Sequence, residues 1–458
     1  MTSASAPRFL VAATSSGSGK TTIACGLMRA LSRRGMAVQA CKCGPDYIDP
    51  MFHRRVLGTP SRNLDLFFAD ENTVCELVAE GSRNANITVI EGVMGYYDGI
   101  ASGSDASSYA LAHATNTPAI LVVEAHGRAL SVAAEVAGFA GFRQPSHVAG
   151  VIVNRCTKGY YPRLKSMIET ETSIPVLGYV PALDDAHLES RHLGLVTADE
   201  VADLQARIDR VASTLEETVD LDALIALAQA APNLSYEPRT LPQTLENPVR
   251  IAIARDESFS FYYDDTLRMM QQLGAELVDF SPLHDAVLPE NIGGLYLGGG
   301  YPELHAAALS ANTSMRENIR SAIAQGLPTI AECGGFMYLH ESMEDANGTP
   351  WPMVGAIKSR SYKLGKLERF GYIRITARED NLLCSAGENL PAHEFHYWDS
   401  ENPGSCFHAQ KPQSSRNWNC AFATPTLYAG YPHLYLYACP TAIKRFLDTC
   451  ARYKDASR

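Results

Sequence analysis

The sequence predicts an α/β protein built from two doubly wound domains, and three observations support this prediction. Short apolar or β-branched runs alternate with helical patterns through the first half of the chain, and the alternation starts again near residue 249. Parallel strands that are buried under helices on both faces give such runs. A stretch with four prolines and little periodicity, residues 231–248, separates the two series. The length of 458 residues also exceeds that of one ordinary domain.

In the first half, the strand-like run FLVAA begins the series. It is followed in order by VQACKCG, ITVIEGV, PAILVVEA, HVAGVIVNR and IPVLGYVP. We assign residues 1–196 to the first domain because strands and helices alternate throughout them. Residues 197–231 predict one or two covering helices, since DLQARIDRVASTLEETVDLDALIALAQA has a helical pattern. Residues 232–248 predict a proline-rich linker.

In the second half, strands are predicted at VRIAIA, GAELVDFSP, IGGLYLGGG and LPTIAECGG. The last two of these runs end in glycines, which mark the point where a strand gives way to a turn. Residues 249–458 are therefore predicted to form a second α/β domain. No internal repeat of fixed period is evident in the chain.

The composition is that of a globular protein, with 46% apolar and 19% charged residues. The formal net charge is −11, whereas nucleic-acid-binding proteins are usually basic, so we predict no nucleic-acid partner. No apolar run approaches the roughly 20 residues that a membrane helix requires, and MTSASAPR lacks the features of a signal peptide, so no membrane partner is predicted. The eleven cysteines form no compact disulfide pattern, and reduced thiols in the cytoplasm are the simplest interpretation.

The stretch VAATSSGSGKTTIACGLMRALSRRG places a glycine-rich loop between a strand and a helix. Small residues such as Gly17 and Gly19 let backbone N–H groups approach phosphate oxygens, and the following helix N-terminus adds partial positive charge. In a P-loop, Lys20 would reach the β- and γ-phosphates and Thr21 would bind Mg²⁺ through its hydroxyl. Thr14 stands where the strict pattern has glycine, so a loop that serves only helix packing is the alternative.

Polar residues follow two further strands, at the edge where the ligands of an open α/β sheet collect. CKCGPDYIDP and VIEGVMGYYDG supply, in order, Lys42, Asp46, Tyr47, Asp49, Glu91 and Asp98. Carboxylates beside a P-loop suit Mg²⁺, because this ion prefers oxygen ligands and keeps several waters. A helix cap or a turn is the alternative role for any one of these acids, but their joint occurrence at strand ends favours a functional site.

In PTIAECGGFMYL, a predicted strand runs into Cys333, and two glycines precede a helical pattern. Such a strand–turn–helix unit projects a nucleophile into a cleft and offers backbone N–H groups to an oxyanion. The candidate oxyanion donors are Gly334 and, from LYLGGGYPEL, Gly299 and Gly300. A thiol nucleophile needs a base, and the candidates are His393, His396 and His433. A buried, inert thiol is the alternative role for Cys333.

The motifs of both halves together resemble the cobyrinic acid a,c-diamide synthases of corrinoid biosynthesis. The resemblance rests, in chain order, on CGPDYIDPMFH, PSRNLDLFF, EGVMGYYDG, AGVIVNR, PVLGYVP, RHLGL, FSFYYDDTL, GAELVDFSPL, LGGGYPEL, AECGGFMYL and HEFHY. The N-terminal half is similar to the dethiobiotin-synthetase branch of P-loop proteins, whose members also depart from the strict glycine pattern. The C-terminal half is similar to class I glutamine amidotransferases of the cobyrinate/cobyrate type. The implied architecture is a P-loop NTPase-like domain followed by a glutamine amidotransferase-like domain.

The resemblance implies a ligase that forms C–N bonds with glutamine as the amide donor. ATP would phosphorylate the a and c acetate carboxylates of cobyrinic acid, because a carboxylate has no adequate leaving group of its own. Ammonia released from L-glutamine would then displace phosphate and leave a primary amide. The implied cofactors are ATP and Mg²⁺, and the implied partners are L-glutamine and cobyrinic acid, a tetrapyrrole-derived macrocycle. The resemblance leaves open whether the chain forms a homodimer.

Carried onto this sequence, the resemblance assigns ATP binding to the glycine loop and to Asn154, which matches an adenine-reading position. The implied nucleotide-binding residues are Gly17, Gly19, Lys20, Thr21, Thr22 and Asn154. The implied metal-binding residues are Thr21, Glu91 and Asp46. The residues implied to position the acetate or the phosphoryl group are Lys42, Asp46, Tyr47, Asp98 and Arg62. Arg54 and Arg55 are further candidates to meet the carboxylates of the macrocycle, with surface salt bridges as the alternative.

In the amidotransferase half, the resemblance implies that Cys333 forms a glutamyl thioester and that His433 is its base. Relatives carry a second histidine two residues after that base, where this chain has Tyr435. The H-P-E sequence of three-member triads is absent, so we expect a Cys–His dyad without an acidic third member. His393 and His396 are predicted to be structural or interface histidines.

Alternatives stay open for the substrate and for the class of protein. Cobyrinic acid is the leading substrate, and the same chemistry on hydrogenobyrinic acid or on nickel sirohydrochlorin is the alternative, because residues that handle carboxylates do not sense the metal inside the macrocycle. A cobyric acid synthase is disfavoured, since its nucleotide domain lacks the CGPDYIDPMFH and PSRNLDL stretches. A P-loop regulatory protein with an inactive amidase domain is the alternative from another class, and the presence of Cys333 and His433 argues against it.

Overall fold

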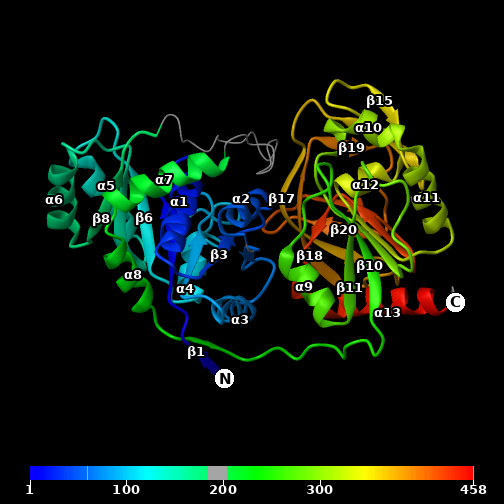
Figure 1. Cartoon of the computed structure of the whole chain (residues 1–458), viewed down its shortest axis with the longest axis horizontal. Helices are drawn as coiled ribbons and strands as arrows, with labels where there is room; N and C mark the ends of the chain where they lie inside the picture. The colour runs from blue at the N-terminus through cyan, green and yellow to red at the C-terminus, as the bar shows by residue number, and fades with distance from the viewer. Residues whose placement is uncertain (59, 184–203, 457–458) are drawn as a thin grey trace. The chain divides into compact units, whose positions relative to one another are not determined.

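The computed structural model of the chain describes residues 1–58, 60–183 and 204–456. These residues form two compact α/β units, Met1–Arg239 and Thr240–Arg458, and each is described by itself (Figure 1). The two-domain α/β fold predicted from the sequence is therefore confirmed. The RHLGL motif and the start of the predicted covering helices, residues 197–203, lie outside the described residues.

The first unit is organised around a seven-stranded parallel sheet with the strand order β4-β3-β5-β2-β6-β7-β8. Its strands are β2 (Arg8–Ala13), β3 (Val38–Cys43), β4 (Arg62–Leu64), β5 (Ile87–Glu91), β6 (Ala119–Glu124), β7 (Val148–Asn154) and β8 (Val176–Val180). Every residue of the central strand β2 is buried, as expected for a strand whose two faces are both covered by helices. Because all seven strands are parallel, their carboxyl ends meet at one edge of the sheet, where the predicted P-loop and acidic residues lie.

Helices cover both faces of this sheet (Figure 1). They are α1 (Lys20–Arg33), α2 (Ile48–Leu57), α3 (Glu71–Ser82), α4 (Ser108–Ala114), α5 (Ser131–Gly141), α6 (Tyr161–Thr172), α7 (Leu204–Thr218) and α8 (Leu221–Gln229). The last two come from the segment predicted to be covering helices, and α7 packs tightly on α1. A Cβ atom on Gly26 of α1 would lie 2.5 Å from Cγ1 of Val211, so only glycine permits this approach. Arg29 and Asp209 join the same helices through an ion pair of 2.7 Å.

A short antiparallel pair holds the beginning and the end of the first unit together. Strand β1 (Thr2–Ala4) pairs with β9 (Leu234–Tyr236). Strand β9 lies inside the stretch 232–248 that the sequence predicts to be a linker, and the first unit ends at Arg239 within the same stretch. The N–H of Arg239 and its guanidinium both bond to the carboxylate of Glu76 on α3, so this part of the stretch is fixed to the first unit.

The second unit has a six-stranded sheet with the order β11-β10-β12-β13-β23-β22, in which all neighbours are parallel except the last pair. Its strands are β10 (Val249–Ala254), β11 (Ala275–Phe280), β12 (Gly294–Leu297), β13 (Thr329–Glu332), β22 (Phe422–Ala423) and β23 (Leu427–Gly430). Its helices are α9 (Asp264–Gln272), α10 (Ala306–Ala311), α11 (Thr313–Ala324), α12 (Gly334–Tyr338) and α13 (Pro440–Ala456), with short 3₁₀ turns η1 (Pro302–Leu304) and η2 (Leu436–Ala438). Apolar residues of β10, β12, β13, α10, α11 and α12 belong to one buried cluster.

Two further sheets in the second unit are not predicted from the sequence. One has the order β15-β14-β16-β19, with strands β14 (His340–Glu344), β15 (Pro350–Pro352), β16 (Ile357–Lys363) and β19 (Trp398–Ser400). The other is antiparallel, with the order β21-β20-β17-β18-β24 and strands β17 (Arg369–Ala377), β18 (Asn389–His396), β20 (Phe407–Gln410), β21 (Asn417–Cys420) and β24 (His433–Leu434). The second sheet matters for function because β24 carries the predicted base His433.

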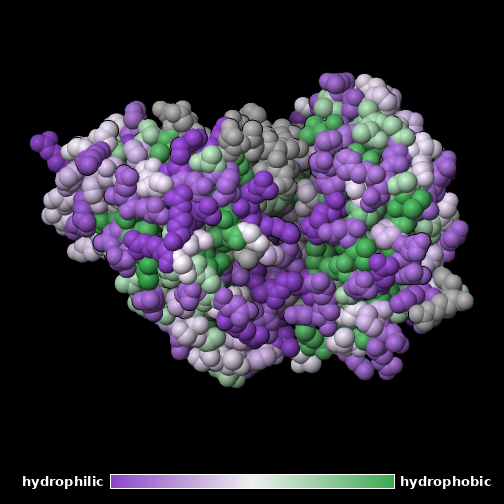
Figure 2. Space-filling model, viewed as in Figure 1, coloured by the Kyte–Doolittle hydropathy of each residue, from purple (hydrophilic) through white to green (hydrophobic). Residues whose placement is uncertain are grey.

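The surface is polar on the face shown in Figure 2, where hydrophilic side chains cover much of each unit and apolar ones occur in small groups. None of the helices in the described part of the chain combines the length and the apolar character that crossing a membrane requires.

Candidate functional site

The glycine-rich loop occupies residues 14–19, between the end of β2 and the start of α1. Gly17 and Gly19 have φ angles of 77° and 86°, in the left-handed region that favours glycine. A Cβ atom on Gly19 would also lie 2.8 Å from Nδ2 of Asn154, which donates a hydrogen bond of 3.0 Å to the carbonyl of Ser18. The loop is therefore shaped by two glycines and braced by a side chain from the end of β7.

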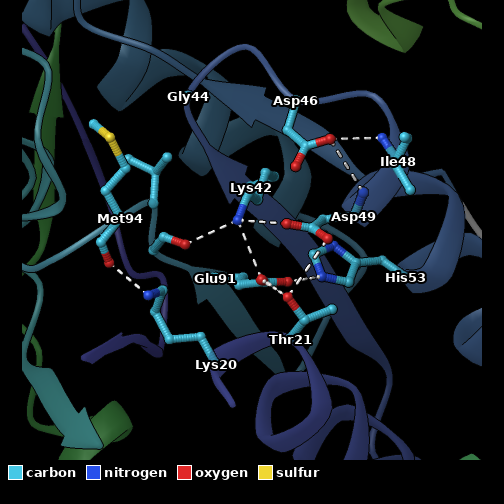
Figure 3. Close-up of polar contacts among 12 residues, drawn as sticks. Lys20, Thr21, Lys42, Gly44, Asp46, Ile48, Asp49, His53, Glu91 and Met94 are labelled. Atoms are coloured by element: carbon cyan, nitrogen blue, oxygen red, sulfur yellow. Dashed lines mark hydrogen bonds and ion pairs between the residues drawn. The ribbon is translucent and has the colours of Figure 1, made fainter. Parts of the chain in front are cut away.

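The side chain of Lys20 bridges the two sides of the loop mouth. Its Nζ atom donates to the carbonyl of Ser15 at 2.9 Å. It also donates to the carbonyl of Met94 at 2.5 Å, the contact that Figure 3 shows. Burial, and then the nearby charge of Lys42, lower the pKa of Lys20 to about 8. An anionic ligand would offer this ammonium group stronger partners than two neutral carbonyls.

Behind the loop, Thr21, Glu91 and Lys42 form a connected polar cluster (Figure 3). The hydroxyl of Thr21 donates to Oε1 of Glu91 at 2.6 Å, and Nζ of Lys42 lies 3.1 Å from the same oxygen. Lys42 also donates to the carbonyl of Gly92 at 2.8 Å. The structure thus brings together three residues that the sequence predicts for metal binding and phosphoryl positioning.

Asp49 and His53 of helix α2 complete the cluster. Asp49 is one of the strand-end acids that the sequence groups as suited to Mg²⁺, whereas the sequence assigns no role to His53. Oδ2 of Asp49 lies 2.7 Å from Nζ of Lys42, and its Oδ1 lies 3.5 Å from the hydroxyl of Thr21. Nε2 of His53 is 2.7 Å from Oε2 of Glu91, and its Nδ1 is 2.9 Å from the hydroxyl of Ser61. Burial alone would lower the pKa of Lys42, but the charges of Asp49 and Glu91 raise it above its ordinary value. Lys42 is therefore a fixed cation.

Asp46, predicted to bind metal, instead caps the start of helix α2. Its Oδ1 accepts hydrogen bonds from the N–H groups of Ile48 at 2.7 Å and Asp49 at 3.4 Å (Figure 3). The spacing of CGPDYIDP places both Asp46 and Asp49 at the beginning of this helix. The orientation of the helix about its own axis decides which of the two side chains faces Thr21. Asp49 makes that contact.

Arg62 is also placed differently from its prediction as a substrate-positioning residue. It is buried in β4, where Nη1 donates to the carbonyl of Leu77 at 3.0 Å and lies 3.4 Å from Oε2 of Glu80. Both partners belong to α3, so the guanidinium ties this helix to the sheet. Arg54 and Arg55, in contrast, are exposed on the last turn of α2.

The other predicted residues of the first unit lie around the loop. Thr22 is buried in the first turn of α1, and Tyr47 is half-buried at the N-cap of α2. Asp98 is exposed, and its Oδ2 accepts from the N–H of Gly95 at 3.1 Å. The charge of Asp98 also raises the pKa of Lys20, although burial outweighs it. This carboxylate therefore belongs to the surroundings of the P-loop lysine.

The donor set behind the loop fits Mg²⁺ bound together with a nucleotide. No group of three or more His, Cys, Asp or Glu side chains that could hold an ion by itself occurs among the residues described. Mg²⁺ at phosphate sites, however, is usually held by one or two protein oxygens together with phosphates and waters. The Thr21 hydroxyl, with Glu91 and Asp49 beside it, supplies oxygens of that kind.

In the second unit, Cys333 lies on a sharp turn between β13 and α12. Its φ and ψ angles are 46° and −103°, a conformation that a non-glycine residue rarely adopts. The turn is held by two hydrogen bonds, from N–H of Cys333 to the carbonyl of Gly430 and from N–H of Gly335 to that of Gly298, at 2.8 and 2.9 Å. Such backbone strain, fixed by its surroundings, is the geometry of a nucleophile elbow.

The three glycines predicted as oxyanion donors surround this turn. A Cβ atom on Gly334 would lie 3.1 Å from the backbone nitrogen of Gly300 and 2.9 Å from Cδ of Pro302, so these two loops are in direct contact. A Cβ atom on Gly299 would lie 2.5 Å from Cε1 of His433. The glycine loop after β12 therefore touches both the nucleophile's neighbour and the predicted base.

The thiol and the imidazole are both neutral. Burial raises the pKa of the Cys333 thiol, and the nearby carboxyl groups of Glu303 and Glu332 raise it further. Burial, and then the neighbouring His393, lower the pKa of His433 to about 3. A neutral imidazole is the form that accepts a proton, so His433 can act as a base at physiological pH.

The other two candidate bases, His393 and His396, and the residue Tyr435 make packing contacts. His393 pairs across the strands with His433 and lies edge-on to the ring of Tyr372, at 5.7 Å between centroids. His396 stacks on Tyr431 at 3.9 Å, and its Nδ1 lies 2.5 Å from the carbonyl of Trp398. Tyr435, where relatives have a second histidine, is buried and lies edge-on to Tyr263 at 5.0 Å.

Comparison with known proteins agrees with both halves of this arrangement. Residues 9–196 match the family model of the CobQ/CobB/MinD/ParA nucleotide binding domain. Residues 250–438 match that of the CobB/CobQ-like glutamine amidotransferase domain. The fold and the two sites thus define a glutamine-dependent amidating ligase with its own nucleotide-binding domain.

Three relatives narrow this class to one family. Cobyrinate a,c-diamide synthase of Salmonella typhimurium (strain LT2) is 41% identical over 452 residues, which cover 97% of this chain and 98% of the relative. The enzyme of the same name from Dehalococcoides mccartyi (strain CBDB1) is 40% identical over 96% of this chain and 97% of its own length. That of Caldanaerobacter subterraneus subsp. tengcongensis is 38% identical over 97% and 98%. The chain belongs to the family of cobyrinate a,c-diamide synthases.

Proposed function

We propose that this chain uses ATP and L-glutamine to convert the a and c acetate carboxylates of cobyrinic acid into primary amides, in corrinoid biosynthesis. The observation that carries the proposal is the presence, in one chain, of a P-loop lysine near a carboxylate cluster and of a glycine loop that contacts both the turn of the strained Cys333 and the neutral imidazole of His433. The relatives that share this chain's whole length carry the name of that enzyme. ATP supplies the leaving group that a carboxylate lacks, and glutamine supplies the nitrogen.

In the first unit, the loop amides and Lys20 would bind the triphosphate, in exchange for the carbonyls of Ser15 and Met94 that the ammonium group now contacts. Thr21, Glu91 and Asp49 would hold Mg²⁺, which when bound neutralises charge on the phosphoryl oxygens. Lys42 would stabilise the transferring phosphoryl group as a permanent cation. Its two carboxylate partners keep it charged and fix its position.

In the second unit, the sulfur of Cys333 would attack the side-chain amide carbon of glutamine while the thiol proton passes to His433. The developing oxyanion would accept hydrogen bonds from backbone N–H groups of the glycine loop and of Gly334. The C–N bond then breaks, the leaving nitrogen takes the proton from His433, and ammonia and a glutamyl thioester result. Water hydrolyses the thioester to glutamate and restores the thiol.

The proposal also includes the metal, the oligomeric state and the location of the protein. Mg²⁺ is the proposed metal because the cluster supplies hard oxygen donors. A homodimer and a cytoplasmic location stay predictions from the sequence and the family. Sedimentation velocity of the purified chain tests the homodimer, and cell fractionation tests the location.

The proposal is tested by comparing glutamine and ammonium chloride as nitrogen sources for the purified chain and its Cys333→Ala variant. We expect the variant to lose glutaminase activity and glutamine-dependent amidation, while amidation with ammonia at high pH persists. Cys439→Ala, which removes a half-buried thiol on the 3₁₀ turn before α13, is the matched control and should retain both activities. Glutaminase activity that survives Cys333→Ala would refute the assignment.

The macrocycle is identified by mass spectrometry of products formed from cobyrinate, hydrogenobyrinate and nickel sirohydrochlorin offered side by side. We expect two amidations of cobyrinate. Each lowers the mass by about one unit, because an –OH group is replaced by –NH₂. Preferential amidation of either of the other two macrocycles would assign the chain to that substrate instead.

A further inference from the structure

A buried carboxyl group stands immediately before the nucleophile. Glu332 is the last residue of β13 and is only 1% exposed. Its Oε2 lies 4.0 Å from Nδ1 of His433, and its Oε1 accepts a hydrogen bond of 3.3 Å from the N–H of Leu434. The phenol of Tyr296, on the neighbouring strand β12, hydrogen-bonds to the same carboxyl group. The carboxyl group is thus held from two sides and directed at the imidazole.

The topology of the sheet explains why two residues so distant in sequence meet. Strands β13 and β23 are parallel, with Glu332 opposite Gly430. The chain then turns at Tyr431 and Pro432 and returns as β24, which begins with His433. Leu434, the residue that donates to Glu332, lies 102 positions further along the chain. No sequence motif brings these positions together, so a search for an acid close after the histidine does not find Glu332.

We propose that Glu332 is the acidic positioning residue of the glutaminase site, an inference that rests on the function proposed above. It holds the imidazole of His433 with Nδ1–H toward the carboxyl group, so that Nε2 carries the lone pair that accepts the thiol proton of Cys333. The expected dyad without an acidic member is thereby replaced by a three-residue arrangement. Its acid comes from the position before the nucleophile and not from a position after the histidine.

The chemistry of the step requires such a partner. When His433 accepts the thiol proton, a positive charge forms on a ring that is almost fully buried. The ionised carboxylate of Glu332 near Nδ1 would stabilise that charge and fix the tautomer of the ring. Glu332 takes up no proton in this scheme. The proton moves from Cys333 to His433 and then to the leaving ammonia.

Among the titratable groups near His433, Glu332 is the one best placed to orient the imidazole. His393 on β18 faces His433 from the next strand, but it is a neutral base whose pKa burial lowers to about 3. Glu303 on η1 acts on the Cys333 thiol, whereas the carboxyl group that lies 4.0 Å from Nδ1 of His433 is that of Glu332. Burial raises the pKa of Glu332 to about 8, so its ionised form becomes more populated as the pH rises through 8.

The test is the isosteric variant Glu332→Gln, which keeps the shape of the side chain but cannot become negatively charged. We expect kcat for glutamine hydrolysis to fall 10- to 100-fold with KM changed less than threefold, because substrate contacts are untouched. Amidation with ammonia should be unchanged. In ¹⁵N-histidine NMR, the Nδ1 resonance of His433, assigned by its loss in His433→Asn, should shift.

Asp265→Asn is the matched control, since Asp265 on α9 is another buried carboxyl group of the second unit, which pairs with Arg268. It should lower stability, measured by tryptophan fluorescence, and leave kcat and the His433 resonance unaffected. A Glu332→Gln protein with wild-type kcat, or an equal loss of kcat in Asp265→Asn, would overturn the inference. The wild-type chain and Cys333→Ala, assayed in parallel, show separately whether the proposed glutaminase exists.

Discussion

The hydroxyl oxygen of Thr21 lies 2.6 Å from Oε1 of Glu91, although 70 positions separate the two residues in the chain. The contact exists because β2 and β5 are adjacent parallel strands, with Val11 opposite Glu91, and the loop after β2 carries Thr21 back over the end of β5. A hydroxyl and a carboxylate from two strand ends thereby share one point at the base of the P-loop. This is the place where a divalent cation would join protein and triphosphate oxygens.

Glu91→Gln should weaken Mg²⁺-dependent ATP binding at least tenfold and reduce ammonia-supported amidation 100-fold or more. The substitution removes the negative charge of Glu91 that attracts Mg²⁺ and Lys42, while the side-chain volume is kept. Isothermal titration of ATP with and without Mg²⁺ measures the first effect independently of catalysis. Glu71→Gln, on the exposed first turn of α3, is the control and should behave as wild type. Equal Mg²⁺ dependence in Glu91→Gln and wild type would exclude Glu91 as a ligand.

Asp49→Asn and Asp46→Asn should have separable effects. Asp49 contacts Lys42 and Thr21, so its variant should lose amidation at least tenfold, and the loss of a buried ion pair should also lower the free energy of unfolding. Asp46 caps helix α2, so its variant should mainly lower the free energy of unfolding, by about 1 kcal/mol. Amidation rates and urea denaturation of both variants check this. The opposite pattern, with Asp46→Asn inactive and Asp49→Asn active, would restore Asp46 as the metal-binding acid.

These two acids also show how far the sequence predicts the site. The alternation of apolar runs with helical patterns predicts both parallel sheets, because buried strands leave a direct signature in composition. It does not predict which acid near the start of α2 faces Thr21, since that depends on the rotation of the helix against the sheet. The contact of His53 with Glu91 depends on the same packing, although CGPDYIDPMFH marks the segment.

The two further sheets of the second unit, one mixed and one antiparallel, have a sequence signal that a search for buried parallel strands overlooks. IKSRSYK in β16 alternates buried and exposed residues, which is typical of a strand with one covered face. The meeting of Glu332 with His433, in contrast, depends on the pairing of β13 with β23 and on the return of the chain as β24. Pairing between strands so distant in sequence is not encoded in either segment alone, so the elbow is predictable and its acidic neighbour is not.

Gly299→Ala should reduce glutaminase activity 100-fold or more, because the added methyl group would lie 2.5 Å from Cε1 of His433. The buried ring must move away from Gly299 and so out of its present position, and the overlap should also lower the free energy of unfolding by about 1–3 kcal/mol. Gly365→Ala, at an exposed position with nothing within 4 Å of the added atom, is the matched control. Ammonia-supported amidation should survive in both. Wild-type glutaminase in Gly299→Ala would mean that His433 is not held against this loop.

The second unit should be most stable near about pH 6, and the reason is a balance between buried histidines and buried carboxyl groups. The histidines are His340, His393, His396 and His433, whose pKa values burial lowers from 6.5 to about 4, 3, 3 and 3. Below pH 6.5 the unfolded chain binds protons on them that the folded protein does not. Stability is therefore lost as the pH falls from 6.5 toward 3.

The carboxyl groups act in the opposite direction. They are Glu303, Glu332 and Glu394, whose pKa values burial raises from 4.5 to about 7, 8 and 7. Between pH 4.5 and 8 the folded protein keeps protons that the unfolded chain has lost, so stability falls as the pH rises. All three tryptophans, Trp351, Trp398 and Trp418, belong to the second unit, so their fluorescence reports its unfolding selectively. A urea midpoint that rises steadily from pH 5 to 8 would contradict the balance.

Lys20→Ala should abolish amidation with either nitrogen source, because activation of the carboxylate precedes the use of ammonia. Lys20 is the cation at the loop mouth, and its removal leaves the β- and γ-phosphates without a charged partner there. Lys165→Ala, on the surface of α6, removes an equal charge far from the loop in sequence and should retain activity. Product formation with ammonium chloride, followed by mass spectrometry, is the measurement. Because ammonia bypasses Cys333 altogether, amidation by Lys20→Ala under these conditions would show that the glycine loop does not hold the nucleotide.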